Sequence, residues 1–162
     1  MKFNKKITCS VCPLKCEIYK ALNRVKSDIS EIETLQVYYK RYEIICKQGS
    51  DVSNAIYLVN GTAKLYIEGL NNRNIILYIL KPNSYIGLLS FFETPKHSYS
   101  VRAIEDCQIC MVDLALVKEL YLKDHEFLIN LNHAFGKSVQ TIMNKLISIQ
   151  ECIKYLESLG WQ

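Results

Sequence analysis

The sequence predicts a mainly β fold with added α structure: a double-stranded β-helix barrel of the jelly-roll or cupin-like kind, followed by a long dimerisation helix. Short β-rich runs succeed one another at intervals of about 8–12 residues with turn residues between them, which is typical of β barrels and sandwiches. After these runs, apolar residues recur in alternating steps of three and four, which is typical of one face of an α-helix. A chain of 162 residues fits one such domain. We divide it into an N-terminal segment (1–26), the barrel (27–124) and the helix (125–162).

The N-terminal segment is basic. It holds seven Lys and Arg residues and one acidic residue, Glu17, whereas the rest of the chain holds 13 basic and 15 acidic residues. A nucleic-acid-binding domain usually concentrates its basic residues on one face, so we interpret these few charges as a solvated basic tail. We expect a short helix that begins at Pro13 and reaches Ala21 or beyond, because the fixed φ and missing N–H of proline suit the first helical position.

The middle of the chain, from Val37 to Leu114, is rich in β-branched and aromatic residues. Asn60-Gly61 and Lys81-Pro82-Asn83 are turn signals between the runs. The predicted strands are Ile44–Cys46, Ala55–Val59, Ala63–Ile67, Asn74–Leu80, Tyr85–Leu88, Tyr99–Ala103 and Gln108–Asp113.

The last segment predicts one long amphipathic helix. Its apolar stripe consists of Leu128, Leu131, Phe135, Val139, Ile142, Leu146, Ile149, Ile153 and Leu156. The first turns can cover the barrel with Phe127, Leu128 and Leu131, but beyond Val139 a small barrel offers no more surface. An isolated helix with an unburied stripe is not stable, so we expect a parallel homodimer. The expected interface residues are Phe135, Val139, Ile142, Leu146, Ile149, Ile153 and Leu156. Gly136 costs the helix about 1 kcal/mol relative to alanine and indicates a close approach or a bend.

Several classes of protein are disfavoured by what the sequence lacks. No apolar run approaches the roughly 18–20 residues of a membrane span, and no apolar signal core follows the first lysines. We therefore expect no membrane span and a cytoplasmic protein, whose seven cysteines stay reduced. A metal oxygenase in a cupin barrel needs several converging histidines, and this chain has only His97, His125 and His133. We expect no enzymatic activity.

Particular residues within residues 37–155 resemble the sensor domain of Crp/Fnr-type bacterial transcription regulators. They are Gln48-Gly49-Ser50, Val59-x-Gly61-x-Ala63, Tyr85-Ile86-Gly87 and Ser100-Val101-Arg102-Ala103. The resemblance implies a cyclic-nucleotide-binding-like barrel, in which Gly87 opens the loop that holds a ligand phosphate. Members of this family usually continue into a helix-turn-helix domain that binds DNA. We expect this chain to lack that domain and to contact DNA only through one.

The cyclic-nucleotide site of the family is altered in this sequence. The resemblance places Leu88 where a glutamate usually holds the ribose, and His97 where an arginine usually neutralises the phosphate. Without the arginine, a buried phosphate loses its bidentate, charged partner. We therefore expect neither cyclic AMP nor cyclic GMP to bind. The alternative function, a small-ligand regulatory module without a metal, would use Gly87, Leu88, His97 and Ser98.

Cys9, Cys12 and Cys16 place three thiols within eight residues. Their spacing around a turn lets three thiolates face one ion or cluster, but a tetrahedral site or a cubane needs a fourth ligand. The resemblance to Fnr-type oxygen sensors implies a 4Fe-4S cluster with Cys110 as that ligand. The gap between Cys12 and Cys16 is shorter than in those sensors, so zinc and unligated or redox-active thiols stay open.

The other cysteines have separate interpretations. Cys107 lies three residues before Cys110 on a predicted strand, so the two side chains point to opposite faces. Cys46 and Cys152 are interpreted as small apolar residues. The function expected from all these residues is a redox- or oxygen-responsive sensory domain of a Crp/Fnr-type regulator.

Overall fold

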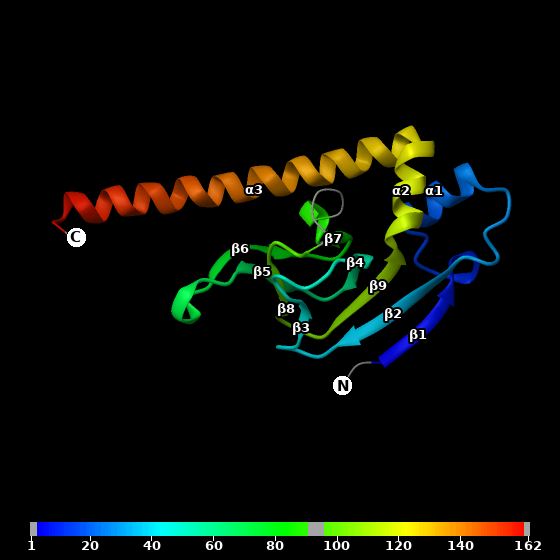
Figure 1. The fold of residues 1–162 in the computed structure, drawn as a ribbon, viewed down its shortest axis with the longest axis horizontal. Helices are drawn as coiled ribbons and strands as arrows, with labels where there is room; N and C mark the ends of the chain where they lie inside the picture. Colours follow the sequence, from blue (N-terminus) through cyan, green and yellow to red (C-terminus); the bar gives the residue numbers. More distant parts are fainter. Residues whose placement is uncertain (1–2, 91–95, 161–162) are drawn as a thin grey trace.

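The computed structural model describes residues 3–90 and 96–160, and it confirms a mixed fold of β-sheet and helix. Figure 1 shows two layers of strands with one long helix running across them. Within these residues, antiparallel strands form a five-stranded sheet in the order β1-β2-β9-β4-β7 and a four-stranded sheet in the order β3-β8-β5-β6. Their bounds are β1 Phe3–Thr8, β2 Glu33–Tyr39, β3 Ile44–Cys46, β4 Asn54–Asn60, β5 Ala63–Ile67, β6 Ile75–Leu80, β7 Ser84–Ile86, β8 Ser100–Ala103 and β9 Cys107–Asp113. No ladder joins the two sheets in the part of the chain that is described, so the closure of the predicted barrel stays a prediction.

The seven predicted strands agree with β3 to β9 within one or two residues at each end. Gly61, in the turn after β4, shows why the sequence needs glycine there. Its φ is +89°, and a Cβ atom would lie 2.3 Å from the carbonyl oxygen of Asp106. Only glycine adopts this conformation at that distance.

Alternate side chains of β4 and β9 build two separate cores. Leu58 and Ile109 lie in the core between the two sheets, whereas Tyr57 and Cys110 lie in a second core on the outer face of the five-stranded sheet. This follows from the two-residue period of a strand. The outer core is the one that three helices cover.

The helices are α1 Glu17–Val25, α2 Leu114–Lys123 and α3 His125–Ser158, with short 3₁₀ turns at Cys9–Val11, Leu70–Asn72 and Leu88–Ser90. The side chains of Asp113 and Asp124 cap the N-termini of α2 and α3 and accept hydrogen bonds from the backbone N–H of Ala115 and of Phe127. Such caps satisfy N–H groups that have no partner within the helix. No described helix is long and apolar enough to cross a membrane.

The N-terminal segment differs from the sequence prediction in two ways. Phe3–Thr8 is not a solvated tail but strand β1, which pairs with β2 at one edge of the five-stranded sheet. Exposed lysines such as Lys5 and Lys6 are compatible with an edge strand and protect it from further pairing. The helix begins at Glu17 instead of Pro13, because Lys15 adopts a left-handed φ of 44° that interrupts any helix before it.

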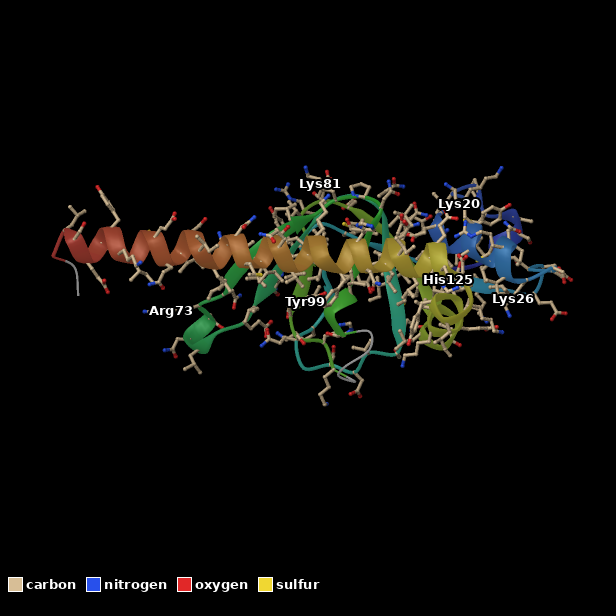
Figure 2. The ribbon with its side chains drawn as sticks, turned by 90° about the horizontal axis from the view of Figure 1, so that it is seen from above. Lys20, Lys26, Arg73, Lys81, Tyr99 and His125 are labelled. Atoms are coloured by element: carbon tan, nitrogen blue, oxygen red, sulfur yellow. The ribbon has the colours of Figure 1, made fainter. Side chains whose placement is uncertain are left out.

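The long helix α3 begins at His125, where the sequence analysis placed it, after α2 and a break at Asp124. Seen from above, α3 lies along the sheets from His125, beside α1 and α2, and its far end extends beyond them (Figure 2). Phe127 and Leu131 cover the outer face of the five-stranded sheet, where they are buried in the outer core. Within the single chain, nothing lies within 4 Å of where a Cβ atom on Gly136 would be.

The predicted interface stripe remains uncovered in the single chain. Phe135 is 44% exposed and Leu146 is 55% exposed. Ile142 is an exception, since it packs partly against the core between the sheets. Val139 and Ile149 are half-buried, and Ile153 and Leu156 are exposed.

Candidate metal centre

The N-terminal cysteines lie on the segment that returns from β1 to α1. Cys9 begins the 3₁₀ turn, Cys12 follows it directly, and Cys16 is the N-cap residue of α1. The backbone N–H of Cys9 donates a 2.9 Å hydrogen bond to the carbonyl oxygen of Ile32, just before β2. Because β2 pairs with β9, this segment is held over the face of β9 that carries Cys110.

All four predicted ligands line one small cavity. Cys9, Cys12, Cys16 and Cys110 surround a space of about 20 Å³, together with Tyr57 and other mostly apolar side chains. The structure therefore brings together residues that are up to about a hundred positions apart in the sequence. Cys107 does not line this cavity, because its side chain points into the core between the sheets, as the two-residue period of a strand predicts.

The environment disfavours free thiolates at these positions. Burial is the main cause that raises the pKa of Cys9 to about 11, and the neighbouring thiols of Cys110, Cys16 and Cys12 contribute to the same rise. Burial also raises the pKa of Cys110 to about 11, against a hydrogen bond with Thr34 that lowers it. Several thiolates in one apolar cavity repel each other, so the charged form needs a cation among them.

The donor set fits a thiolate-bound metal, although the thiols are not arranged as ligands in this conformation. Among the described residues, no group of three or more His, Cys, Asp or Glu side chains is placed to hold a metal ion. A cavity of about 20 Å³ has room for about one water-sized sphere. Any larger group requires the segment from Cys9 to Cys16 to open outward.

One further contact was not visible in the sequence. The side-chain amide of Gln36 on β2 donates a 3.9 Å hydrogen bond to the Cys12 sulfur, and its carbonyl oxygen accepts a 2.7 Å hydrogen bond from Gln108 on β9. Gln36 is buried and pairs in register with Cys110. A hydrogen bond to a ligand sulfur is one of the factors that set the potential of a cluster.

The predicted small-ligand residues do not share a cavity. Gly87 has a positive φ of 81°, and Leu88 is buried in the outer core. His97 is buried, lines a separate cavity of about 250 Å³ with Cys46 on its wall, and has a pKa lowered by burial. Ser98 is exposed, and its backbone N–H donates to the Ser90 hydroxyl. Residues 91–95 between them lie outside the described residues.

Cys46 and Cys152 lie apart from the cavity of the four cysteines. Cys46 is buried on β3 in the core between the sheets, as expected of a small apolar residue. Cys152 is exposed on α3. These two thiols serve as buried and exposed controls for experiments on the other four.

Comparison with known protein families shows which domain family the chain belongs to. The model of the cyclic nucleotide-binding domain matches residues 36–124, which is more than half of the chain. This chain belongs to the cyclic nucleotide-binding domain family. The match begins on β2 and ends at the junction of α2 and α3, so Cys110 lies in the family domain, whereas Cys9, Cys12 and Cys16 precede it.

Solved structures of bacterial regulators share this domain fold. FixK2 from Bradyrhizobium japonicum is 17% identical with a TM-score of 0.63, and the match covers 70% of this chain and 56% of FixK2. The CooA mutant from Carboxydothermus hydrogenoformans is 15% identical with a TM-score of 0.64 over 90% of each chain. The sensor domain of the transcriptional regulator DNR from Pseudomonas aeruginosa is 14% identical with a TM-score of 0.58, over 68% of this chain and 75% of that one. This chain spans a little over half the length of FixK2. No curated protein sequence matches it.

Proposed function

We propose that this chain is the sensory domain of a Crp/Fnr-type transcription regulator and that it responds to oxygen or redox state through an iron-sulfur cluster. The observation that carries the proposal is the single cavity lined by Cys9, Cys12, Cys16 and Cys110. The family domain and its likeness to regulators such as FixK2 and the DNR sensor domain support the regulatory part.

The four cysteines would hold a 4Fe-4S cluster as thiolates, one ligand for each corner iron. When bound, the cluster would supply a redox-active centre that reacts with oxygen or other oxidants. The chain supplies apolar walls that limit access of water, such as Ile18 and Val59, and the Gln36 amide beside the Cys12 sulfur. A single zinc ion is the competing occupant, because four thiolates also suit tetrahedral zinc.

The proposed output is a change in a homodimer formed by α3. The exposed stripe from Phe135 to Leu156 is the expected seam, and a second copy of this helix is the partner that covers it. Cys9 and Cys110 belong to the same core as Phe127 and Leu131, which anchor the first two turns of α3. A change in the packing around the thiols therefore reaches the dimer helix directly. In this proposal, DNA is bound by a helix-turn-helix domain joined to the dimer.

The test is anaerobic reconstitution of the full chain with ferrous iron and sulfide. We expect about four irons and four sulfides per chain, with a broad absorption near roughly 400 nm that oxygen bleaches. Single serine substitutions at Cys9, Cys12, Cys16 and Cys110 should abolish this absorption, because a cubane needs every ligand. Iron content and the visible spectrum are the measurements.

Two variants control for the general loss of a thiol. Cys46→Ser removes a buried thiol and Cys152→Ser an exposed one, and both should leave the iron content unchanged. Less than one iron per chain in the wild type would contradict the assignment of an iron-sulfur cluster. Stoichiometric zinc in that same sample would make the four cysteines a structural zinc site.

A further inference from the structure

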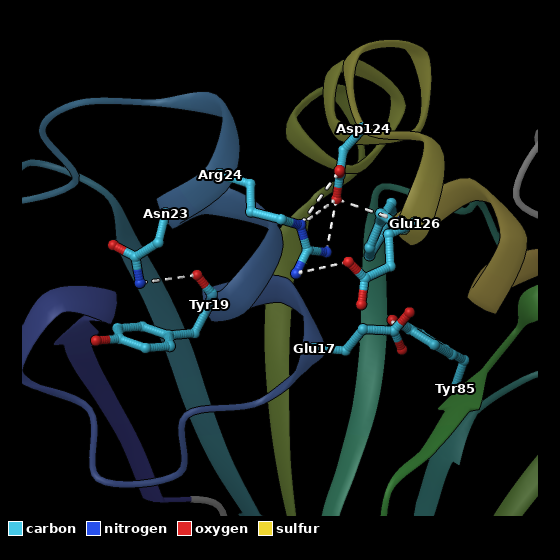
Figure 3. Close-up of polar contacts among 8 residues, drawn as sticks. Glu17, Tyr19, Asn23, Arg24, Tyr85, Asp124 and Glu126 are labelled. Atoms are coloured by element: carbon cyan, nitrogen blue, oxygen red, sulfur yellow. Dashed lines mark hydrogen bonds and ion pairs between the residues drawn. The ribbon is translucent and has the colours of Figure 1, made fainter.

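The C-terminal end of α1 is tied to the first turn of α3 by charged side chains. Figure 3 shows the Arg24 guanidinium between Asp124 and Glu126. Its Nε atom donates to Asp124 Oδ1 at 3.2 Å and to Oδ2 at 3.0 Å, and its Nη2 atom donates to Oδ2 at 2.7 Å. Its Nη1 atom lies 3.5 Å from the carboxylate of Glu126. A two-point contact of this kind fixes orientation as well as distance.

Asp124 also begins α3. The same carboxylate accepts a hydrogen bond of 3.3 Å from the backbone N–H of Phe127, and the Phe127 side chain is fully buried in the outer core. The Asp124 side chain is only 11% exposed, and Arg24 holds its pKa below the usual range. Arg24 is therefore bound to the group that sets where α3 starts and how its first turn is oriented.

At its N-terminal end, α1 begins beside one of the four cysteines of the proposed site. Cys16 is its N-cap residue, and the nine helical residues that follow end at Val25, a length of about 13 Å at 1.5 Å per residue. Ile18, Ala21 and Leu22 are buried in the outer core, so α1 is held there as one packed unit. Glu17, the next residue after Cys16, accepts a hydrogen bond from Tyr85 at the same end.

We propose that Arg24 is the positioning residue that couples occupancy of the thiol site to the start of α3. This rests on the proposed function, since the thiols must bind a metal or cluster for the coupling to operate. The closed cavity requires the segment from Cys9 to Cys16 to open when a cluster enters. Opening displaces the N-terminal end of α1, and the ion pair at its other end transmits that displacement to Asp124 and the first turn of α3.

The chain offers a matched control at the same end of α1. Lys26 lies 3.2 Å from Glu119, and its side chain is 33% exposed against 34% for Arg24. Glu119 belongs to α2, so this second ion pair joins α1 to a helix other than α3. Removing it costs one ion pair of similar exposure without breaking the link to Asp124.

The test compares hydrogen exchange of the amides of residues 125–131 in the anaerobically reconstituted full chain and in the same chain emptied of metal. In the wild type and in Lys26→Gln, loading should change the exchange rate about fivefold or more, the lower end of typical coupling between sites. In Arg24→Gln and in Asp124→Asn, which keeps a capping side chain, loading should change it less than about twofold, with the iron content unchanged. The coupling would be overturned if loading changed the exchange rate in Arg24→Gln as much as in the wild type. It would also be overturned if loading left the exchange rate of the wild type unchanged.

A second measurement needs no metal and separates this inference from the proposed function. In the empty protein, the alkylation rate of Cys16, followed by peptide mass spectrometry, should rise about fivefold in Arg24→Gln and stay unchanged in Lys26→Gln. If the wild type takes up no iron, the proposed function fails, and this rate alone decides whether α1 links Cys16 to α3. Equal rates in the wild type and Arg24→Gln contradict the link.

Discussion

At the scale of single residues, Cys110 connects the two parts of the proposed site, because it is the only one of the four thiols that lies within the family domain. Its burial against Tyr57 and Val112 keeps the thiol protonated when no metal is present. The raised pKa has a consequence for stability that can be measured in the empty protein.

We predict that the empty protein loses stability as the pH rises from 9 toward 11. The folded state holds the pKa of Cys110 at about 11, above its usual value of 9.0. Between these values the folded state binds more protons than the unfolded state, so the free energy of unfolding falls with rising pH. Cys110→Ser cannot ionise and should reduce this slope, whereas Cys152→Ser should not. Urea unfolding under reducing conditions measures both, and equal slopes in all three proteins would contradict the buried thiol.

The sequence predicted the four cysteines but not the groups around them. The trio is visible from its density, and Cys110 from its place after Ala103 and Glu105 in the family resemblance. Gln36 and Arg24 carry no such signal, because their roles depend on partners that are distant in sequence, Cys12 and Asp124, and on the way that sheet and helix pack. Leu88 and His97, which the family resemblance placed at one cyclic-nucleotide site, line different cavities.

At the scale of elements, α3 is longer than the body of the protein can cover. Its first turns bury Phe127 and Leu131, whereas no residue from 132 to 160 is fully buried in the single chain. Helical periodicity alone was enough to predict this stripe. It was not enough to place the start of α1, because the left-handed backbone of Lys15 is a local conformation that the proline signal at Pro13 does not reveal.

We predict that the chain forms a dimer through this stripe and that Ile149→Glu converts it to monomers. Two carboxylates in a paired seam are each costly to bury, and every 1.4 kcal/mol weakens association about tenfold. Ile147→Glu is the matched control, since Ile147 is 53% exposed and lies on the opposite side of the helix from the stripe. Light scattering measures the mass in solution. A dimer that persists in Ile149→Glu, or one that is lost equally in Ile147→Glu, would argue against this seam.

At the scale of the whole molecule, the five-stranded sheet separates two cores with different roles. The core between the sheets is closed by residues such as Leu58 and Val101 and holds the fold together. The outer core contains Cys9 and Cys110 together with the root of α3. The sequence predicted β3 to β9 well because turns and alternation are local, but it missed β1, β2 and α2, whose places depend on the sheet edge and on the outer core.

The central claim is that the four cysteines bind one iron-sulfur cluster in each chain of a dimer. Native mass spectrometry of the anaerobically reconstituted full chain tests both parts at once. The account predicts the mass of a dimer with two 4Fe-4S clusters, and the mass of a dimer without them for Cys110→Ser. A monomer, a dimer free of metal, or a dimer with one zinc ion per chain in the wild-type protein would contradict it.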